Sequence, residues 1–439
     1  MDGHGDHEVD MPNGDATTPP AQGEDNGQAA AEGGLNNLPP AQTGLAYYLS
    51  FFTGNVKPLS DWAYDKPIPV RFPIACTRAL GQPLFVNNPF SGLLILVGLF
   101  VQSPWRTICG LLAMLSAQTT GLVLHLDRDG LDNGAFSFNG LLVGYVLASS
   151  SAAGDWYGYL VFPVAICGMF SSMPNAFLNY FLYYFIKFTL TISTTWLLVF
   201  SIYSTILNSA LSVLLSNWGV PSFNLAFNVV AVSFIAATGP LNPHFPQHGG
   251  GPNPIPWGEE ALDWLQVLAS IPRGIAQCYG SDSLITGCLM SIGMLICSPI
   301  VFSHCLLGST LGALTGLALA APPAEIYNGS WGYNSALTCG AVGGVFYVLN
   351  WSSHLMALIS AIFAALVRGA MARFFAAAQV PVVAFPFCIV AALFLLVDSN
   401  SKQLLRVPGD RMTYPEEHRK LFKSTTVGVT NVQPDQDPT

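Results

Sequence analysis

The chain has 439 residues, of which 51% are hydrophobic and only 9% carry a charge. Its mean hydropathy of +0.46 excludes it from the ordinary class of soluble globular proteins. A helix that crosses a bilayer needs about 20 apolar residues, so several of the apolar runs predict short, tilted or re-entrant helices. The apolar and mostly uncharged runs are 88–102, 107–125, 156–171, 176–207, 220–238, 284–302, 305–321, 353–366 and 381–397.

Residues 1–45 form a segment unlike the rest of the chain. They hold eight acidic side chains and no Lys or Arg among many Gly, Pro, Asn and Gln residues. Such a segment buries too little apolar surface to offset the entropy of ordering it, so it is predicted to be a disordered tail. Most of the net charge of −9 belongs to this tail. The acidity of the chain therefore indicates nothing about a substrate.

Basic residues flank the apolar core on both sides. The positive-inside rule then places both ends of the chain in the cytoplasm, which requires an even number of crossings. Because the first apolar run starts near residue 88, no cleavable signal peptide is predicted. The flanking basic residues are Lys57, Lys66, Arg71, Arg78, Lys402, Arg406, Arg411, Arg419, Lys420 and Lys423.

The core contains an internal repeat with a constant offset. Segment 78–92 (RALGQPLFVNNPFSG) aligns with segment 273–287 (RGIAQCYGSDSLITG), which pairs Gln82 with Gln277 at an offset of 195. Chance would not keep one register through so long an apolar stretch, so the repeat is a duplication. The same offset pairs Arg78 with Arg273, Gly98 with Gly293, Asn139 with Asn334 and Leu142 with Leu337.

A duplication in a membrane protein is typical of two half-units that enclose a path near the middle of the bilayer. If each half crosses an odd number of times, the second half is inverted and the total is even. We therefore predict an all-α polytopic membrane protein with two inverted five-helix repeats around a central pore. The halves are 60–240 and 263–400, joined by a linker loop at 241–262, and a cytoplasmic tail follows at 401–439.

Each half also has a stretch rich in Gly and Asn, at 134–148 and 329–343. Such residues are costly inside a bilayer unless the backbone faces protein or a water-filled cavity. These stretches are therefore predicted to be re-entrant pore half-helices.

Four strings of residues now support a resemblance. FVNNPFSGLLILVGLFVQSPW (85–105), AATGPLNPHFP (236–246), SIPRGIAQCYGSDS (270–283) and MTYPEEHR (412–419) resemble the animal urea transporter family over about residues 60–420. The resemblance implies ten transmembrane helices, two tilted pore half-helices, and a homotrimer in the plasma membrane with one pore per subunit. It also implies passive, channel-like conduction of urea.

The most characteristic element of that family is a Leu-Pro-x-x-Thr-x-Pro-Phe motif in each half, whose threonines lie in the middle of the pore. The first copy here reads VPSFNLAF (220–227) and the second reads VPVVAFPF (380–387). The threonine positions hold Asn224 and Ala384, and Ala226 replaces the second proline of the first copy. The resemblance implies that Asn224 and Ala384 are mid-pore residues, with a changed solute preference or rate.

The first half is longer than the second by about 35 residues, which lie at 172–206. This stretch has no Gly and one Ala, whereas the surrounding core is rich in both. Three interpretations are open: an interfacial or lipid-facing helix, an error of gene prediction, or a further crossing that breaks the symmetry of the repeat.

Urea is small, planar and neutral, so a path must replace its hydration without binding it tightly. A slot between apolar or aromatic walls, edged by uncharged polar groups, meets both needs. Gln82 and Gln277 are predicted at the edge, with backbone capping as the alternative. Asn139 and Asn334 are predicted to position the half-helices, with solute contact as the alternative. The predicted substrate-binding residues are Gln82, Phe85, Leu142, Asn224, Phe227, Gln277, Leu337, Ala384 and Phe387.

Other functions are disfavoured by the residues. An intramembrane enzyme or an ion-coupled carrier needs paired ionisable residues inside the spans, and none is recognisable. The nine Cys residues are scattered singly, which indicates reduced thiols rather than disulfides or metal ligands. No metal, cofactor or nucleic-acid partner is expected. The alternative function is a channel for water, ammonia or another small neutral amide on the same scaffold.

Overall fold

The computed structural model describes residues 53–123, 125–150, 156, 215, 217–238, 262–397, 404–408, 412–420 and 422. All of them belong to one unit, Leu49–Thr439. The predicted tail 1–45, the insert 172–206 and nearly all of the linker 241–262 lie outside the described residues.

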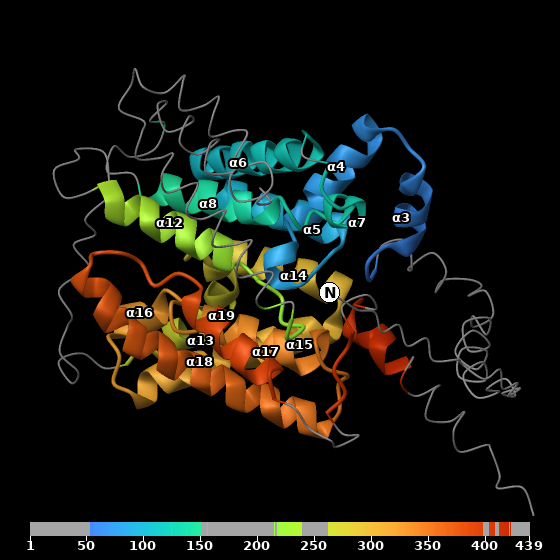
Figure 1. Ribbon diagram of the computed structural model, residues 1–439. Helices are drawn as coiled ribbons and strands as arrows, with labels where there is room; N and C mark the ends of the chain where they lie inside the picture. Colours follow the sequence, from blue (N-terminus) through green and yellow to red (C-terminus); the bar gives the residue numbers. More distant parts are fainter. Residues whose placement is uncertain are drawn as a thin grey trace, which may run out of the picture. The chain divides into compact units, whose positions relative to one another are not determined.

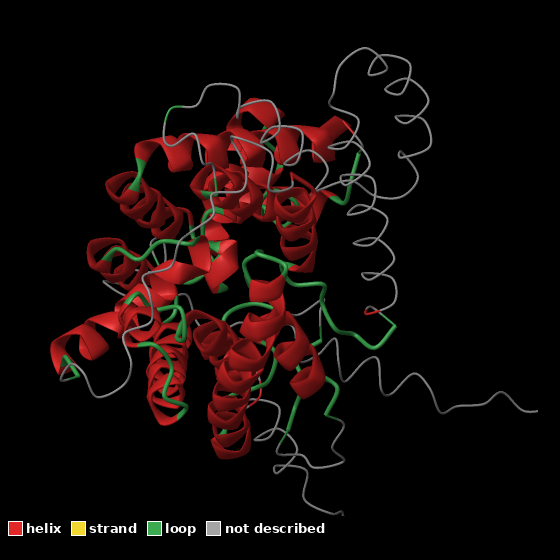
Figure 2. Cartoon of the chain, turned by 90° about the vertical axis from the view of Figure 1, so that its left-hand side faces the viewer, coloured by secondary structure: helices red, strands yellow, loops and turns green. Residues whose placement is uncertain are grey.

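The described residues form helices joined by loops, with no strand among them (Figure 2). Helices of the first half gather together, and so do helices of the second half (Figure 1). The first half contains α3 (Lys57–Tyr64), α4 (Ile68–Ala79), η1 (Gln82–Leu84), α5 (Pro89–Gln102), α6 (Pro104–Val123), α7 (Arg128–Asp132), α8 (Phe138–Ser149) and α12 (Leu225–Thr238). The second half contains α13 (Trp264–Ala276), η3 (Gln277–Tyr279), α14 (Leu284–Cys297), α15 (Pro299–Ala318), α16 (Pro323–Tyr327), α17 (Tyr333–Gly340), η4 (Ala341–Val345), α18 (Trp351–Ala377) and α19 (Phe385–Leu395).

The helix bounds follow the offset found in the sequence. Both ends of α14, α15 and α16 lie 195 residues after the corresponding ends of α5, α6 and α7. The short helices η1 and η3 are related by the same offset, and each is followed directly by a residue with positive φ, Phe85 (60°) or Gly280 (73°). Equal sequence spacing has therefore produced equal local structure in the two halves.

Polar caps followed by proline fix where several of these helices begin. The Asn88 side chain accepts hydrogen bonds from Phe90 N and Ser91 N at the start of α5. Ser298 accepts from Val301 N at the start of α15. The first turn of a helix has amide groups without internal partners, and proline at its first position loses no hydrogen bond. The Asn-Pro and Ser-Pro pairs are therefore helix start signals.

Helices α5 and α14 pack against each other through buried hydroxyl groups. Ser91 Oγ donates to Gly293 O at 2.6 Å, and Thr286 Oγ1 donates to Gly98 O at 2.8 Å. The early part of each helix thus contacts the late part of the other, so the two helices are antiparallel. The glycines permit this approach, because a Cβ atom on Gly293 would lie 3.2 Å from Ser91 O.

Two described helices, α15 and α18, are long and apolar enough to cross a membrane, and α13–η3 with α14 forms one further candidate span bent by 79°. At 1.5 Å per residue, α8 is about 18 Å long and α17 about 12 Å, which is well short of a hydrocarbon core of about 30 Å. The described part of the chain is therefore that of a helical membrane protein with both long and short apolar helices.

The beginning and the end of the described chain meet at one end of α14 and α15. Gly54 N donates to Cys297 O at 3.0 Å, and Ser298 Oγ donates to Glu416 Oε2 at 2.7 Å. Glu416 also accepts from Ile300 N at 2.9 Å, which satisfies an open amide at the start of α15. The segments before α3 and after α19 therefore lie on the same side of these two helices.

Candidate functional site

The two predicted edge glutamines make the same hydrogen bond in their respective halves. Gln82 Nε2 donates to Asn133 O at 2.7 Å, and Gln277 Nε2 donates to Asn328 O at 2.9 Å. Each acceptor lies 51 residues after its glutamine, in the turn that precedes α8 or α17. The alternative role predicted for these glutamines was a hydrogen bond to the backbone, and in both halves the amide nitrogen makes such a bond. Neither Oε1 atom has a donor among the described residues, so both remain available as acceptors.

The turns at Asn133 and Asn328 are held tightly against the preceding helices. Gly134 (φ 74°) and Gly329 (φ 86°) follow them, and a Cβ atom at either would lie within 2.6 Å of a backbone nitrogen, at Ala79 or Gly274. Only glycine combines this backbone conformation with so close an approach. Each turn is thereby fixed beside its glutamine.

Four phenylalanine rings form a closed set of edge-to-face contacts. Phe85 lies 6.2 Å from Phe346 and 5.9 Å from Phe387, and Phe223 lies 5.6 Å and 4.9 Å from the same two rings. Phe85 and Phe387 were predicted as slot walls, whereas Phe223 and Phe346 were missed. Phe223 could have been found, since it lies inside the first VPSFNLAF motif. Phe346 carries no comparable signal, because its repeat position 151 lies outside the aligned stretch.

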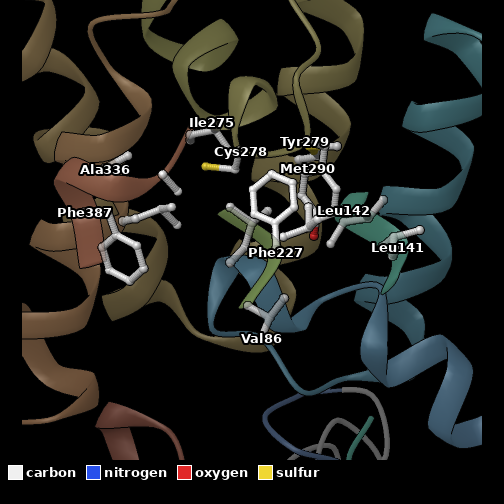
Figure 3. Packing of buried hydrophobic residues seen from close by; sticks show 14 of the residues in the cluster. Val86, Leu141, Leu142, Phe227, Ile275, Cys278, Tyr279, Met290, Ala336 and Phe387 are labelled. Atoms are coloured by element: carbon white, nitrogen blue, oxygen red, sulfur yellow. The ribbon is translucent and has the colours of Figure 1, made fainter. Parts of the chain in front are cut away.

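The other predicted wall residues lie in the same buried core but are not among the four phenylalanines that contact one another. Leu142 and Leu337 are buried, and so is Phe227. Figure 3 shows Phe227, Leu142 and Phe387 within one cluster of buried side chains that draws on both halves.

The two motif positions that were predicted to lie in mid-pore, 224 and 384, are connected through neighbouring side chains. Cys388 Sγ donates to Asn224 Oδ1 at 3.0 Å. Asn228 Oδ1 accepts from Ala384 N at 2.9 Å, and Asn228 Nδ2 lies 3.3 Å from Cys388 Sγ. All four residues are buried. The two motifs are therefore joined by a polar cluster in which Asn228 and Cys388, the residues directly after each motif, were missed by the sequence argument.

The two predicted positioning residues behave differently. Asn334 Oδ1 accepts from Phe387 N at 3.0 Å, and its Nδ2 donates to Val383 O at 3.4 Å. Tyr333 also donates to Val383 O, so two donors stabilise a β-branched residue whose φ is 45°. Asn139 Oδ1, at the equivalent position, is buried and has no hydrogen-bond partner among the residues that the structure describes.

No group of three or more metal-ligating side chains occurs among the described residues. None of the eight described cysteines forms a disulfide, and seven of them are buried. The chemistry of the site is therefore that of neutral amide and backbone groups between aromatic and aliphatic walls. Such a site can exchange hydrogen bonds with a small neutral solute.

The fold and this site define a helical membrane protein with neutral polar groups at its centre. A family model described as urea transporter matches residues 74–195 and 180–399. Urea transporter 1 of Rattus norvegicus is 37% identical over 379 residues, which cover 85% of this chain and 89% of the relative. Urea transporter 1 of Ovis aries is 35% identical over 406 residues, covering 91% and 94%.

The chain therefore belongs to the urea transporter family. This membership confirms the resemblance drawn from the four sequence strings, and it places the protein among transporters rather than enzymes. The two matched stretches overlap at residues 180–195, which lie inside the insert 172–206.

Proposed function

We propose that the protein conducts urea passively, down its concentration gradient, along a path between its two halves. The relatives in rat and sheep, both described as urea transporter 1, support urea as the solute. The relatives do not favour the alternative of a channel for water, ammonia or another amide.

The observation that carries this proposal is the matched pair of glutamines. In each half the amide nitrogen is bonded to a fixed backbone carbonyl, and the amide oxygen is left as an acceptor. Urea has four N–H donors that must be satisfied when its water is removed, since each unpaired buried polar group costs about 1–3 kcal/mol. A fixed neutral acceptor at each end of a path offers this exchange without the tight binding that a charge would bring.

The remaining predicted site residues line the path between these two ends in this proposal. The rings of Phe85 and Phe387 supply flat apolar walls, and Leu142, Leu337 and Phe227 supply the aliphatic and aromatic packing behind them. Asn224 and Ala384 mark the centre. Their closeness is supported by the polar cluster of Asn228 and Cys388, which links the two motifs.

The path lies between two inverted five-helix repeats in this proposal, with α8 and α17 as re-entrant half-helices. The reciprocal bonds of Ser91 and Thr286 support the inversion. Contacts that are reciprocal between equivalent residues define a local two-fold axis. Because α5 and α14 are antiparallel, this axis is perpendicular to them, so it lies in the plane of the membrane if they cross it.

Both chain ends are proposed to lie in the cytoplasm, with the protein in the plasma membrane as a homotrimer. The meeting of Gly54 and Glu416 at the junction of α14 and α15 supports an even number of crossings. The basic residues near both ends support the cytoplasmic side. The trimer and the plasma membrane rest on the family resemblance.

Stopped-flow efflux of urea from proteoliposomes tests the proposal on the full chain and on Gln82→Leu and Gln277→Leu. The full chain is expected to release urea faster than protein-free liposomes, and each variant is expected to be about 10-fold slower, by the loss of one hydrogen bond in the path. Gln118→Leu is the matched control, because this buried carboxamide also bonds a backbone carbonyl, Leu131 O, but has Ala313 as its repeat partner.

A chain that releases urea no faster than empty liposomes contradicts the proposal. If water or ammonia moves instead, the alternative function is correct. The same assay on a chain without residues 172–206 separates the interpretations of the insert. If urea passes only after the deletion, residues 172–206 are an inhibitory segment or an error of gene prediction.

A further inference from the structure

Asn139 and Asn334 occupy equivalent positions in the two halves, yet within the described part of the chain only the Asn334 side-chain oxygen accepts a hydrogen bond. Asn334 lies in the first turn of α17 and bonds Phe387 N, an amide in the first turn of α19 that has no acceptor within its own helix. This bond joins the second half-helix to the second motif. It satisfies both groups.

In the first half, the corresponding acceptor and donor are both open. Asn139 Oδ1 is buried and has no partner in the described ranges of the chain, and the whole residue is only 7% exposed. Phe227 N, the counterpart of Phe387 N, has no acceptor among the described residues. It lies in the first turn of α12, before intrahelical bonding begins. Two buried polar groups that are bonded to each other in one half are thus unbonded in the other.

A buried unsatisfied polar group is costly and calls for an explanation. A molecule that places a C=O group and an N–H group side by side would satisfy both atoms, by accepting from Phe227 N and donating to Asn139 Oδ1. Urea and other small primary amides have this arrangement. Neither a cation nor a molecule with acceptors alone could serve both groups.

We infer that Asn139 Oδ1 and Phe227 N form a binding site for the permeating amide in the first half only, while Asn334 closes the equivalent site in the second half. This inference rests on the proposed conduction of urea. Asn139 is then a residue that determines specificity, and Asn334 is a positioning residue. The internal repeat would give the path two equivalent amide sites, but only the site in the first half is open to the solute.

Another buried carboxamide shows why the comparison between the halves is needed. Gln118 Oε1 is also buried without a partner. However, Gln118 Nε2 bonds Leu131 O at 2.9 Å, and its repeat partner is Ala313, so the second half has no equivalent carboxamide bond that would identify a missing donor. An open oxygen alone therefore does not make a site for an amide.

The test compares Asn139→Leu with Asn334→Leu in two measurements, urea efflux and thermal unfolding in detergent. Leu removes the carboxamide but keeps the number of heavy atoms and the branch at Cγ. Asn139→Leu is expected to lower urea permeability about fivefold, by the loss of one hydrogen bond to the solute, and to leave the unfolding temperature unchanged or higher. Asn334→Leu is expected to lower the unfolding temperature, because Phe387 N and Val383 O lose their partner.

Thiourea provides a second readout, since it keeps the N–H groups of urea but has a weaker acceptor. Asn139→Leu is expected to lower thiourea and urea permeability by the same factor. The inference is overturned if Asn139→Leu conducts urea like the unmodified chain, or if it unfolds as early as Asn334→Leu. Failure of the unmodified chain to conduct urea contradicts the proposed function itself and is seen before any variant is compared.

Discussion

Ser91 and Thr286 make the same hydrogen bond in opposite directions across the contact between α5 and α14. Each hydroxyl is fully buried and bonds the backbone carbonyl of a glycine in the other helix, Gly293 or Gly98. The two residues are 195 positions apart, as are the two glycines. Each half thus contributes one hydroxyl residue and one glycine, and the two equivalent pairs form a self-complementary contact between the halves.

Replacing Ser91 with Ala and Thr286 with Val is expected to destabilise the protein by about 1 kcal/mol at each position, because each change removes one buried hydrogen bond. The two bonds share no partner, so their effects should add. The control is Ser291→Ala, since the Ser291 hydroxyl bonds Gly287 O within its own helix at 2.7 Å. Thermal unfolding in detergent that is no earlier for the double variant than for the control would contradict this account.

Gly329 and Gly280 separate the cost of backbone conformation from the cost of crowding. Both have positive φ, 86° and 73°, but a Cβ atom on Gly329 would lie 2.5 Å from Gly274 N, whereas one on Gly280 would meet nothing nearer than 3.9 Å. Gly280→Ala is expected to cost about 1 kcal/mol, and Gly329→Ala about 3 kcal/mol, because crowding is added. Equal unfolding temperatures for the two variants would contradict this prediction, because they would show that the turn at residue 329 shifts to make room for the added Cβ atom.

The proposed centre of the path is tested by placing threonine at both motif positions. Asn224 Oδ1 now accepts from Cys388 Sγ, and Ala384 has no polar side chain. Asn224→Thr with Ala384→Thr supplies a hydroxyl from each half, and urea permeability is expected to rise several-fold, by about one hydrogen bond in the path. The bond to Asn228 Oδ1 is donated by the backbone N of residue 384, so it survives the change of this side chain. A stopped-flow rate equal to that of the unmodified chain would remove these two positions from the path.

Glu325 holds Arg368 of α18 beside Trp331. The Arg368 Nη1 atom lies 2.7 Å from Glu325 Oε2, and its guanidinium carbon lies 4.5 Å from the centre of the Trp331 ring. Glu325→Gln is expected to destabilise the protein by about 1–2 kcal/mol, a modest effect because the carboxylate is partly exposed. Asp129→Asn, at an exposed position on α7, is the control. High salt should reduce the difference between the two unfolding temperatures if charge pairing is its cause.

Much of the local structure could be predicted from residue patterns. Asn88-Pro89 and Ser298-Pro299 start helices because their side chains satisfy open amides and proline loses nothing there. The offset of 195 predicted equal elements in both halves, and the bounds of α5 and α14 follow it. The family was also accessible from the sequence, since the strings around 85–105 and 270–283 are long enough to be specific. The inverted arrangement, the domain limits and the site residues remain predictions.

The sequence by itself therefore determined the composition of a membrane protein, the duplication and the family, because these depend on residue type and spacing along the chain. The tertiary structure decided which polar groups pair. Gln82 and Asn133 are 51 residues apart, and Asn228 and Cys388 are 160 apart, distances over which no local pattern specifies a hydrogen bond. For the same reason Asn139 and Asn334, equivalent in sequence, differ in structure: Asn334 Oδ1 accepts from Phe387 N, whereas Asn139 Oδ1 has no partner among the described residues.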